Sequence, residues 1–365
     1  MRRVMLEDMI LTKDMPSAAG SRMLAGYVSP FDATVVEKLR EGGFEIAGKL
    51  PVGEFGIDLV GETCYEKEGA YAAANALKTD TVMGVIALDV NGAPRRVAAQ
   101  KDLVCLKPTY GTVSRYGTVA VASSADTVGV LARSAADCGT LFATIATPDA
   151  RDTTMQARKP VEGRVQRVAV LPFGADAAVT AKMDAAKGKM CANGIEICEA
   201  EAGVIATARA CWNTLLCAEL SANLSRFDGI KYGHRSASFA TLEQLYTESR
   251  SEGLGLLVKS AILYGSDVLY GENYEKKYQK ALRVRRVIAE AFRTLFAEYD
   301  AVLLPASSKL QYTETDHPFA ENLYTAPASL TGLPAVVADG VQLIGPAFSE
   351  ERLLAVATLL EEVRR

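Results

Sequence analysis

Short apolar runs alternate with amphipathic segments along most of the chain. Continuous apolar runs such as 82–90 and 300–307 are typical of strands that are covered on both faces. Other β-prone runs are bounded by Gly, Pro or charged residues, which is the usual setting of a strand. Together these runs predict strands at 4–12, 44–50, 82–90, 165–174, 194–201, 300–307 and 341–345.

Apolar residues with helical spacing lie between several of these strands. In residues 33–42, the side chains of Val35 and Leu39 share one face of a helix. Asp32 is placed to cap this helix, and Ser134 is placed to cap another. Such patterns predict helices at 33–42, 69–78, 134–146, 176–193 and 349–365, and a mainly helical segment at about 203–300. The alternation favours an α/β fold with a mixed central β-sheet and helices on both faces.

Three stretches are rich in turn-forming residues. Residues 91–94 (NGAP) follow a predicted strand and are expected to form a turn, and 325–338 is turn-rich before it becomes strand-like. Residues 103–133 combine one proline and three glycines with seven Ser or Thr residues. This composition favours strand ends, tight turns and a loop that faces a ligand. Since no linker, repeat or low-complexity segment interrupts the pattern, we expect a single domain over 1–365.

The charge balance argues against direct binding of nucleic acid. Forty Lys and Arg residues oppose 44 Asp and Glu residues, so the formal net charge is −4. Proteins that bind nucleic acid usually present a broad basic field. One basic cluster stands out, and we favour its interpretation as the solvated face of a helix. Its members are Lys276, Lys277, Lys280, Arg283, Arg285 and Arg286.

The reactive residue types are sparse and scattered. The seven cysteines contain no C-x-x-C pair, and the start of the chain lacks the apolar core of a secretory signal, so we expect reduced thiols in the cytoplasm. With only two histidines, a His-rich metal site is disfavoured, and nothing in the pattern implies a cofactor. No apolar run approaches the length of a membrane span, so no membrane association is expected.

Several segments, in order along the chain, carry a family resemblance. They include CLKPTYGTVSRYGTVAVASSADTVGVLARS, AELSANLSRFDGIKYGHRS, YTESRSEGLGLLVKSAILYGSDVL, EYDAVLLPAS and SLTGLPAVV. On these segments the chain resembles the amidase signature family and, within it, the A subunits of tRNA-dependent amidotransferases. The resemblance covers nearly the whole chain. It implies the amidase signature fold, and it implies that the family's N-terminal helical arm is missing here.

The resemblance also implies a demanding chemistry, namely amide hydrolysis by a serine nucleophile, a second serine in a cis peptide and a lysine. The nucleophile must supply an oxygen, the second serine relays its proton, and the lysine must be neutral enough to accept that proton. Backbone N–H groups of a Gly-rich turn then stabilise the oxyanion.

The positions that match these three groups carry other residues. Glu7 stands at the lysine position, and Ala93 stands at the nucleophile position of the turn ALDVNGAPRRV. The nearest equivalent of the second serine is Gly69, in a loop that is shortened relative to the family. Pro94 also removes a backbone donor directly after the nucleophile position. The resemblance therefore implies a degenerate triad, with no catalytic residue to assign.

The substrate-binding positions differ from the family as well. Where the family has a pair of arginines, this chain has Ser260 and Ala261. Asn322 replaces an aspartate, and a less secure alignment places Trp212 at a binding tyrosine. The candidates for the remodelled pocket are Asp89, Asn91, Gly92, Arg95, Trp212, Ala261 and Asn322.

Two functional hypotheses remain at this point. The first is a catalytically inactive amidase-like protein that binds either amidotransferase B- and C-like subunits or an unknown small ligand. The alternative is an active amidase with a relocated mechanism, for which Glu7 and Cys105 are the nearest reactive groups. We favour the first, because a glutamate at a strand end is usually solvated or ion-paired and a cysteine in an apolar run is usually a packing residue. A relic without function is a third possibility.

Overall fold

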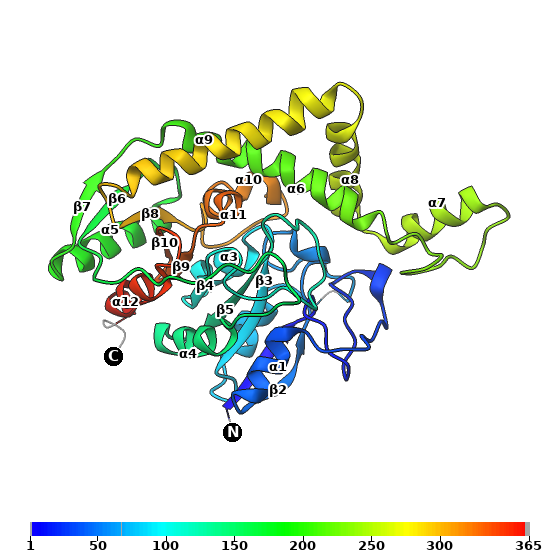
Figure 1. The fold of residues 1–365 in the computed structure, drawn as a ribbon, viewed down its shortest axis with the longest axis horizontal. Helices are drawn as coiled ribbons and strands as arrows, with labels where there is room; N and C mark the ends of the chain where they lie inside the picture. The colour runs from blue at the N-terminus through cyan, green and yellow to red at the C-terminus, as the bar shows by residue number, and fades with distance from the viewer. Residues whose placement is uncertain (1, 67, 362–365) are drawn as a thin grey trace.

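The computed structural model describes residues 2–66 and 68–361, and within them one mixed sheet of ten strands runs through the molecule (Figure 1). The strand order is β2-β1-β3-β5-β4-β9-β10-β8-β6-β7. The strands are β1 (Arg2–Glu7), β2 (Phe44–Leu50), β3 (Gly84–Asp89), β4 (Val104–Lys107), β5 (Thr127–Ala132), β6 (Arg167–Val170), β7 (Glu196–Glu199), β8 (Ala301–Pro305), β9 (Ala335–Ala338) and β10 (Val341–Ile344). Pairing is parallel at both ends of the sheet, among β2, β1 and β3 and among β8, β6 and β7, and antiparallel between them.

Helices connect these strands and cover both faces of the sheet. The α-helices are α1 (Thr34–Glu41), α2 (Ala72–Ala76), α3 (Ala93–Gln100), α4 (Ala135–Ile145), α5 (Ala177–Ala192), α6 (Ala208–Leu224), α7 (Leu242–Gly253), α8 (Leu256–Leu269), α9 (Lys280–Leu295), α10 (Pro318–Glu321), α11 (Ala326–Thr331) and α12 (Glu350–Glu361). Four shorter helical segments are η1 (Arg22–Leu24), η2 (Glu54–Gly56), η3 (Gly203–Thr207) and the π-helical η4 (Tyr274–Gln279).

The side chains of β3 show how the sheet divides the core. Ile86 and Leu88 belong to the large apolar cluster that includes α1 and α4. Val85 and Ala87, which point the opposite way, belong to a second cluster with α2 and α3. All six residues of β3 are buried, as its continuous apolar run predicted. The prediction of an α/β fold with helices on both faces of a mixed sheet is confirmed.

Several element predictions are confirmed, and others are wrong in instructive ways. The predicted strand 44–50 coincides with β2, and Ser134 caps α4 by accepting a hydrogen bond from the backbone N–H of Asp137. Asp32, however, does not cap α1, which follows Ala33 without a side-chain cap. The Asp32 carboxylate instead accepts from the backbone N–H of Lys13 at 3.0 Å and contacts Arg40.

Other boundaries also differ from the sequence prediction, and three of these differences have a clear physical reason. The strand predicted over 4–12 ends at Glu7, where the backbone turns and the N–H of Ile10 bonds back to the Glu7 carbonyl. The turn predicted at 91–94 passes directly into α3, because Pro94 fits the first turn of a helix. Residues 326–331, expected to be turn-like, form α11. The last four residues of the helix predicted over 349–365 lie outside the described residues.

The segment from η3 to α9 is helical and adds no strand to the sheet. Helices α6 and α9 lie over the body, whereas α7 projects from it (Figure 1). In the part of the chain that the structure describes, no helix is long and apolar enough to cross a membrane.

Candidate functional site

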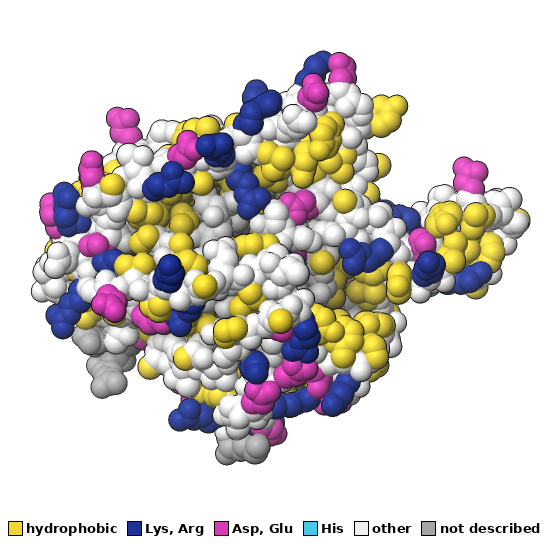
Figure 2. Space-filling view, viewed as in Figure 1, with side chains coloured by type: hydrophobic (Ala, Val, Ile, Leu, Met, Phe, Trp, Pro, Cys, Tyr) yellow, Lys and Arg dark blue, Asp and Glu magenta, His cyan; other side chains and the backbone are white. Residues whose placement is uncertain are grey.

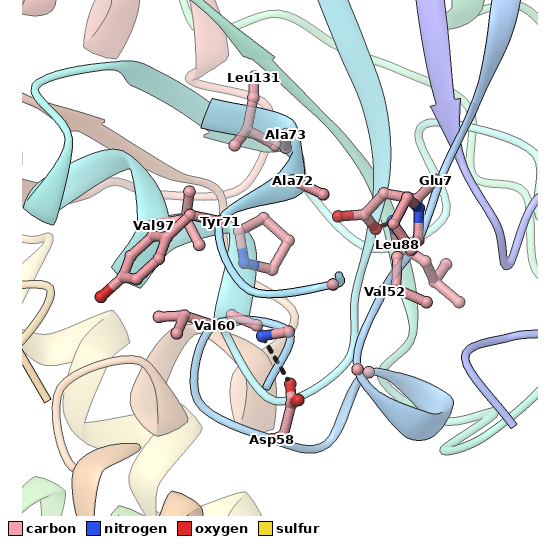
Figure 3. Close-up of a pocket in the computed structure, with 17 residues that line it drawn as sticks. Glu7, Val52, Asp58, Val60, Tyr71, Ala72, Ala73, Leu88, Val97 and Leu131 are labelled. Carbon is pink, nitrogen blue, oxygen red and sulfur yellow. Dashed lines mark hydrogen bonds between the residues drawn. The ribbon is translucent and has the colours of Figure 1, made fainter. Parts of the chain in front are cut away.

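Three positions that the family resemblance assigns to reacting groups line one cavity (Figure 3). Glu7 is the last residue of β1, Gly69 precedes α2, and Ala93 begins α3. The sheet therefore brings together residues that are far apart in the sequence. The cavity has a volume of about 30 Å³. This is room for about one water molecule, since one molecule occupies roughly 30 Å³ of liquid water.

The Glu7 carboxyl group faces this cavity from the end of β1 (Figure 3). One of its oxygens, Oε2, accepts a hydrogen bond of 2.9 Å from the backbone N–H of Leu88 in β3. Burial raises the pKa of Glu7 to about 8, and the nearby carboxylates of Asp89 and Asp58 contribute to the rise. Glu7 is therefore mostly protonated at neutral pH, and it places no positive charge at the position where a lysine is expected.

A second carboxyl group, that of Asp58, faces the same cavity (Figure 3). Its side chain is buried and accepts hydrogen bonds from the backbone N–H groups of Gly61 at 3.2 Å and Thr63 at 2.8 Å. Burial raises the pKa of Asp58 to about 7, although these hydrogen bonds oppose the shift. Two acids with elevated pKa values thus share a small, poorly solvated space.

The remaining walls carry few groups that take part in amide chemistry. Among the described residues that line the cavity there is no serine, threonine, cysteine, lysine or histidine. The Tyr71 hydroxyl donates to Gln100 at 2.6 Å, and burial raises the pKa of this phenol. At the start of α3, Ala93 offers a methyl group and Pro94 offers no N–H. The lining residues therefore supply carboxyl groups, the phenol of Tyr71 and apolar surface.

Next to this cavity, Asp89 and Arg95 form an ion pair that is fully buried. Arg95 Nε and Nη2 donate to the two carboxylate oxygens of Asp89 at 2.7 and 3.0 Å. Burial alone raises the pKa of Asp89, but the Arg95 guanidinium outweighs it and holds the pKa below its usual value. Arg95 also donates to Gln342 and Ser329, at 2.8 and 2.7 Å. This arginine therefore ties β3 and α3 to β10 and α11.

A buried amide network occupies the space beside the ion pair. Asn91 Oδ1 accepts hydrogen bonds from Trp212 Nε1 at 3.0 Å and from Asn322 Nδ2 at 2.8 Å. Asn91 Nδ2 donates to the Ile57 carbonyl at 2.9 Å. The Asn322 amide oxygen is buried and has no hydrogen-bond partner among the described residues. Trp212 is 1 % exposed, so its indole fills this region of the core.

The other two pocket candidates are packing residues in this structure. Gly92 adopts a left-handed conformation with φ of 84°, and a Cβ there would lie 2.4 Å from the side chain of Thr325. Ala261 is 1 % exposed in α8. The structure brings Glu7, Gly69 and Ala93 together around the cavity. The seven pocket candidates, Asp89, Asn91, Gly92, Arg95, Trp212, Ala261 and Asn322, do not line it.

Comparison with known proteins decides the family. The family profile described as Amidase matches residues 4–85 and 73–354. This chain belongs to the amidase family. It is 34 % identical over 406 residues to the A subunit of a glutamyl-tRNA(Gln) amidotransferase from Symbiobacterium thermophilum, a match that covers 99 % of this chain and 82 % of that protein. A second such A subunit, from Paraburkholderia xenovorans, is 34 % identical over 407 residues, covering 96 % and 82 %.

Solved structures of amidase proteins superpose on nearly the whole chain. The crystal structure of the A subunit of a glutamyl-tRNA(Gln) amidotransferase from Thermotoga maritima has a TM-score of 0.81 and 26 % identity, and it covers 99 % of this chain and 83 % of that one. A 6-aminohexanoate cyclic dimer hydrolase has a TM-score of 0.80 at 19 % identity, covering 99 % and 84 %. The latter similarity shows the fold alone.

Two buried cations of this amidase chain were not singled out by the sequence. Arg96 donates to three backbone carbonyls, those of Leu59, Asn91 and Asp58, at 3.1, 2.7 and 2.8 Å. It therefore holds the cavity-lining segment against α3. Lys107 is also buried, and its amine donates to the Leu333 carbonyl at 3.0 Å. Burial lowers the pKa of Lys107 to about 7. The roles of Arg96 and Lys107 can be recognised only from their contacts in the folded protein. The one local signal in the sequence is the unusual pair Arg95–Arg96 directly after a proline.

Three other side chains with a nucleophilic oxygen or sulfur, Cys105, Ser114 and Ser124, are buried or hydrogen-bonded away from the cavity. Cys105 is buried in the cluster between the sheet and α2–α3, and burial raises its thiol pKa well above the usual value. Ser114 donates to Asp149 at 2.7 Å, and Ser124 contacts Glu219 and Arg285. In the described ranges, no group of three or more His, Cys, Asp or Glu residues is arranged to hold a metal ion.

Proposed function

We propose that this amidase-family protein does not hydrolyse amides and acts by binding. The observation that carries the proposal is the cavity lined by Glu7, Gly69 and Ala93. At the three positions that the resemblance assigns to lysine and two serines, it presents a carboxyl group, a glycine and a methyl group. None of these supplies the alkoxide and the amine base that the family's chemistry requires.

The expected loss of rate and the size of the cavity also argue against amide hydrolysis. Removing the nucleophile of a concerted triad typically lowers kcat by about six orders of magnitude. The volume of about 30 Å³ also leaves little room for an amide substrate, because pockets for small molecules usually measure about 300–1,000 Å³. The network of Asn91, Trp212 and Asn322 fills neighbouring space with side chains that bond to one another.

The binding role that we propose is that of a complex subunit in the cytoplasm. Proteins 34 % identical to this one carry the name of the A subunit of an amidotransferase, so B- and C-like subunits are the proposed partners. All seven cysteines are free, which suits a reducing compartment.

The surface offers a place for such partners. Twelve of the fifteen exposed large apolar side chains among the described residues lie within 230–287, and apolar atoms gather over α7 and α8 in Figure 2. They include Tyr232, Leu242, Leu256, Leu263 and Tyr270, each at least 60 % exposed. Exposed apolar clusters of this kind mark protein–protein interaction sites.

A binding measurement and an activity measurement together test the proposal. We expect calorimetric titration with glutamine, asparagine or acetamide to give no saturable heat, and we expect no ammonia release above that of buffer. The matched variant is Glu7→Gln, which keeps the size of the side chain. Ammonia release by the natural protein that disappears in Glu7→Gln would overturn the proposal.

One observation favours a second candidate, an amidase with a relocated mechanism. The carboxyl groups of Glu7 and Asp58, with pKa values raised to about 8 and about 7, face a cavity that is large enough for water. Two such acids can activate water without a serine, one as base and one as acid. This candidate predicts a bell-shaped pH–rate profile that both Glu7→Gln and Asp58→Asn abolish. The small cavity volume weighs against it.

A further inference from the structure

A second cavity, unrelated to the triad positions, opens at the end of the parallel strands β6 and β8. Its volume is about 280 Å³, roughly nine times that of the cavity beside Glu7. Leu171 follows directly after β6, and Leu304 lies near the end of β8, so the carboxyl ends of both strands form its floor. Of the residues that the structure describes, none lines both cavities.

The connections of these strands place the cavity where small ligands bind in open α/β sheets. After β6 the chain passes through α5 and forms β7, which pairs with one edge of β6. The later strand β8 pairs with the other edge of β6 (Figure 1). The strands that follow β6 in the sequence are therefore added on opposite sides of it. In open sheets, a crevice forms outside the carboxyl ends of strands at such a point, and ligands bind there.

The walls of the cavity are held in place before any ligand arrives. The Tyr324 hydroxyl accepts a hydrogen bond of 2.9 Å from the backbone N–H of Gly174 and donates to the carbonyl of the same residue. This double contact fixes the loop after β6 against the segment between α10 and α11. Ile205 of η3, which is 5 % exposed, closes another side. A preformed pocket spares the ligand the cost of ordering its own site.

The lining defines the chemistry of the ligand. Among the described lining residues there is no charged side chain, and the Tyr324 hydroxyl is already paired with Gly174. An ion that entered would lose its hydration without gaining a partner. Aliphatic and aromatic side chains, among them Phe173 and Leu323, instead offer dispersion contacts to a flat apolar body.

We propose that this cavity binds a compact, uncharged, apolar small molecule, cyclic or aromatic, of about eight to twelve non-hydrogen atoms. The binding site is independent of the triad positions, so it does not depend on whether the protein hydrolyses amides. Indole is a suitable probe, because it is flat, uncharged and of this size. Its charged counterpart is indole-3-acetate.

Calorimetric titration of the full-length protein with indole tests the proposal. We expect saturable one-to-one binding with a Kd of about 0.1–1 mM, the range for a ligand of about nine non-hydrogen atoms. Indole-3-acetate is expected to bind at least about tenfold more weakly, because its carboxylate finds no counter-charge. The absence of saturable indole binding, or equal binding of the two probes, overturns the proposal.

Two substitutions locate the binding. The first variant is Ala206→Phe. Ala206 is an exposed residue of η3 at the rim of the second cavity, and a Phe ring at this position would fill the cavity. Its matched control is Ala210→Phe, at another exposed alanine, which lies in α6 outside the cavity. Neither change removes a core contact, and circular dichroism verifies folding. We expect Ala206→Phe to weaken indole binding at least about tenfold and Ala210→Phe to leave it within about twofold. Equal binding by both variants places indole elsewhere and overturns the proposal.

Discussion

The indole N–H of Trp212 donates a hydrogen bond of 3.0 Å to the side-chain oxygen of Asn91, deep in the core. Trp212 comes from α6 and Asn91 lies two residues before Ala93, so this bond joins the helical segment to the turn that the resemblance assigns to the nucleophile. A buried polar contact of this kind stabilises the fold only while both partners remain satisfied.

Replacing Trp212 by Phe should therefore destabilise the protein. The Phe ring keeps much of the packing but removes the donor to Asn91 and leaves unfilled space. We expect the free energy of unfolding in urea to fall by about 1–3 kcal/mol. Because Trp212 is the single tryptophan, circular dichroism is the appropriate probe. Tyr264→Phe is the control, since its hydroxyl pairs with Thr214 at the exposed surface. An equal effect of both substitutions would mean that the buried bond adds nothing to stability.

The pair of Asp89 and Arg95 predicts a larger effect. Asp89→Asn leaves the guanidinium of Arg95 buried at 0 % exposure without its counter-charge. We expect a loss of about 3–5 kcal/mol in the free energy of unfolding. Glu272→Gln provides the comparison, because it breaks an exposed ion pair with Lys276 and should change stability by less than about 1 kcal/mol. A loss below about 1 kcal/mol for Asp89→Asn would contradict the structural role of the pair.

The fold was predictable wherever hydrophobic periodicity decided it. The apolar run at 82–90 contains β3, because burial on both faces of the sheet leaves few alternatives to a strand. Predictions from residue type alone were wrong where contacts with distant parts of the chain compete with local hydrogen bonds. Asp32 has the right residue type for a helix cap, yet its carboxylate bonds to Lys13 and Arg40 instead.

The site was predictable in outline and not in detail. The resemblance assigned Glu7, Gly69 and Ala93 to the three positions of one catalytic triad, and in the structure these residues line one cavity. Asp58 and Arg96 were missed because their roles come from contacts with backbone groups that no local pattern encodes. The size of the cavity depends on side-chain packing in three dimensions, so no sequence pattern indicates it.

The raised pKa of Glu7 predicts a pH dependence of stability. Its pKa is about 8 in the folded protein and about 4.5 as an unperturbed group. Between these values the folded state binds more protons than the unfolded state, so stability falls as pH rises and levels off above pH 8. Glu7→Gln removes this contribution. We expect the variant to exceed the natural protein in free energy of unfolding by at least about 1 kcal/mol at about pH 9, and by less at about pH 5.

The exposed carboxyl of Glu243 provides the control for that experiment. Glu243→Gln should leave the slope of stability against pH unchanged between about pH 5 and about pH 9, values chosen to cover the transition of roughly 4.5 to 8. If Glu7→Gln and the natural protein show the same slope, Glu7 titrates normally and the description of a poorly solvated cavity is wrong.

The exposed apolar surface over 230–287 is where we expect the proposed partner subunits to bind. The double substitution Leu263→Asp and Tyr270→Ser changes side chains that are 72 % and 80 % exposed, so the fold should be unaffected. In co-expression with B- and C-like amidotransferase subunits, we expect the natural protein to co-purify with them and this variant to be lost from the complex. Val28→Asp, at a position 46 % exposed outside this surface, should co-purify normally. Retention of the double variant would contradict the assignment of this surface.

Hydrolysis of glutamine labelled with ¹⁵N in its side-chain amide is the sharpest test of whether the protein is inactive. Nuclear magnetic resonance follows labelled ammonium released by the natural protein, by Glu7→Gln and by Asp58→Asn, prepared in parallel and with or without the proposed partner subunits. We expect all three to release ammonium at the same background rate, because the described residues that line the cavity beside Ala93 include neither a serine nor an amine base. Release by the natural protein that saturates with glutamine and is lost in either variant would show that the protein is an amidase after all.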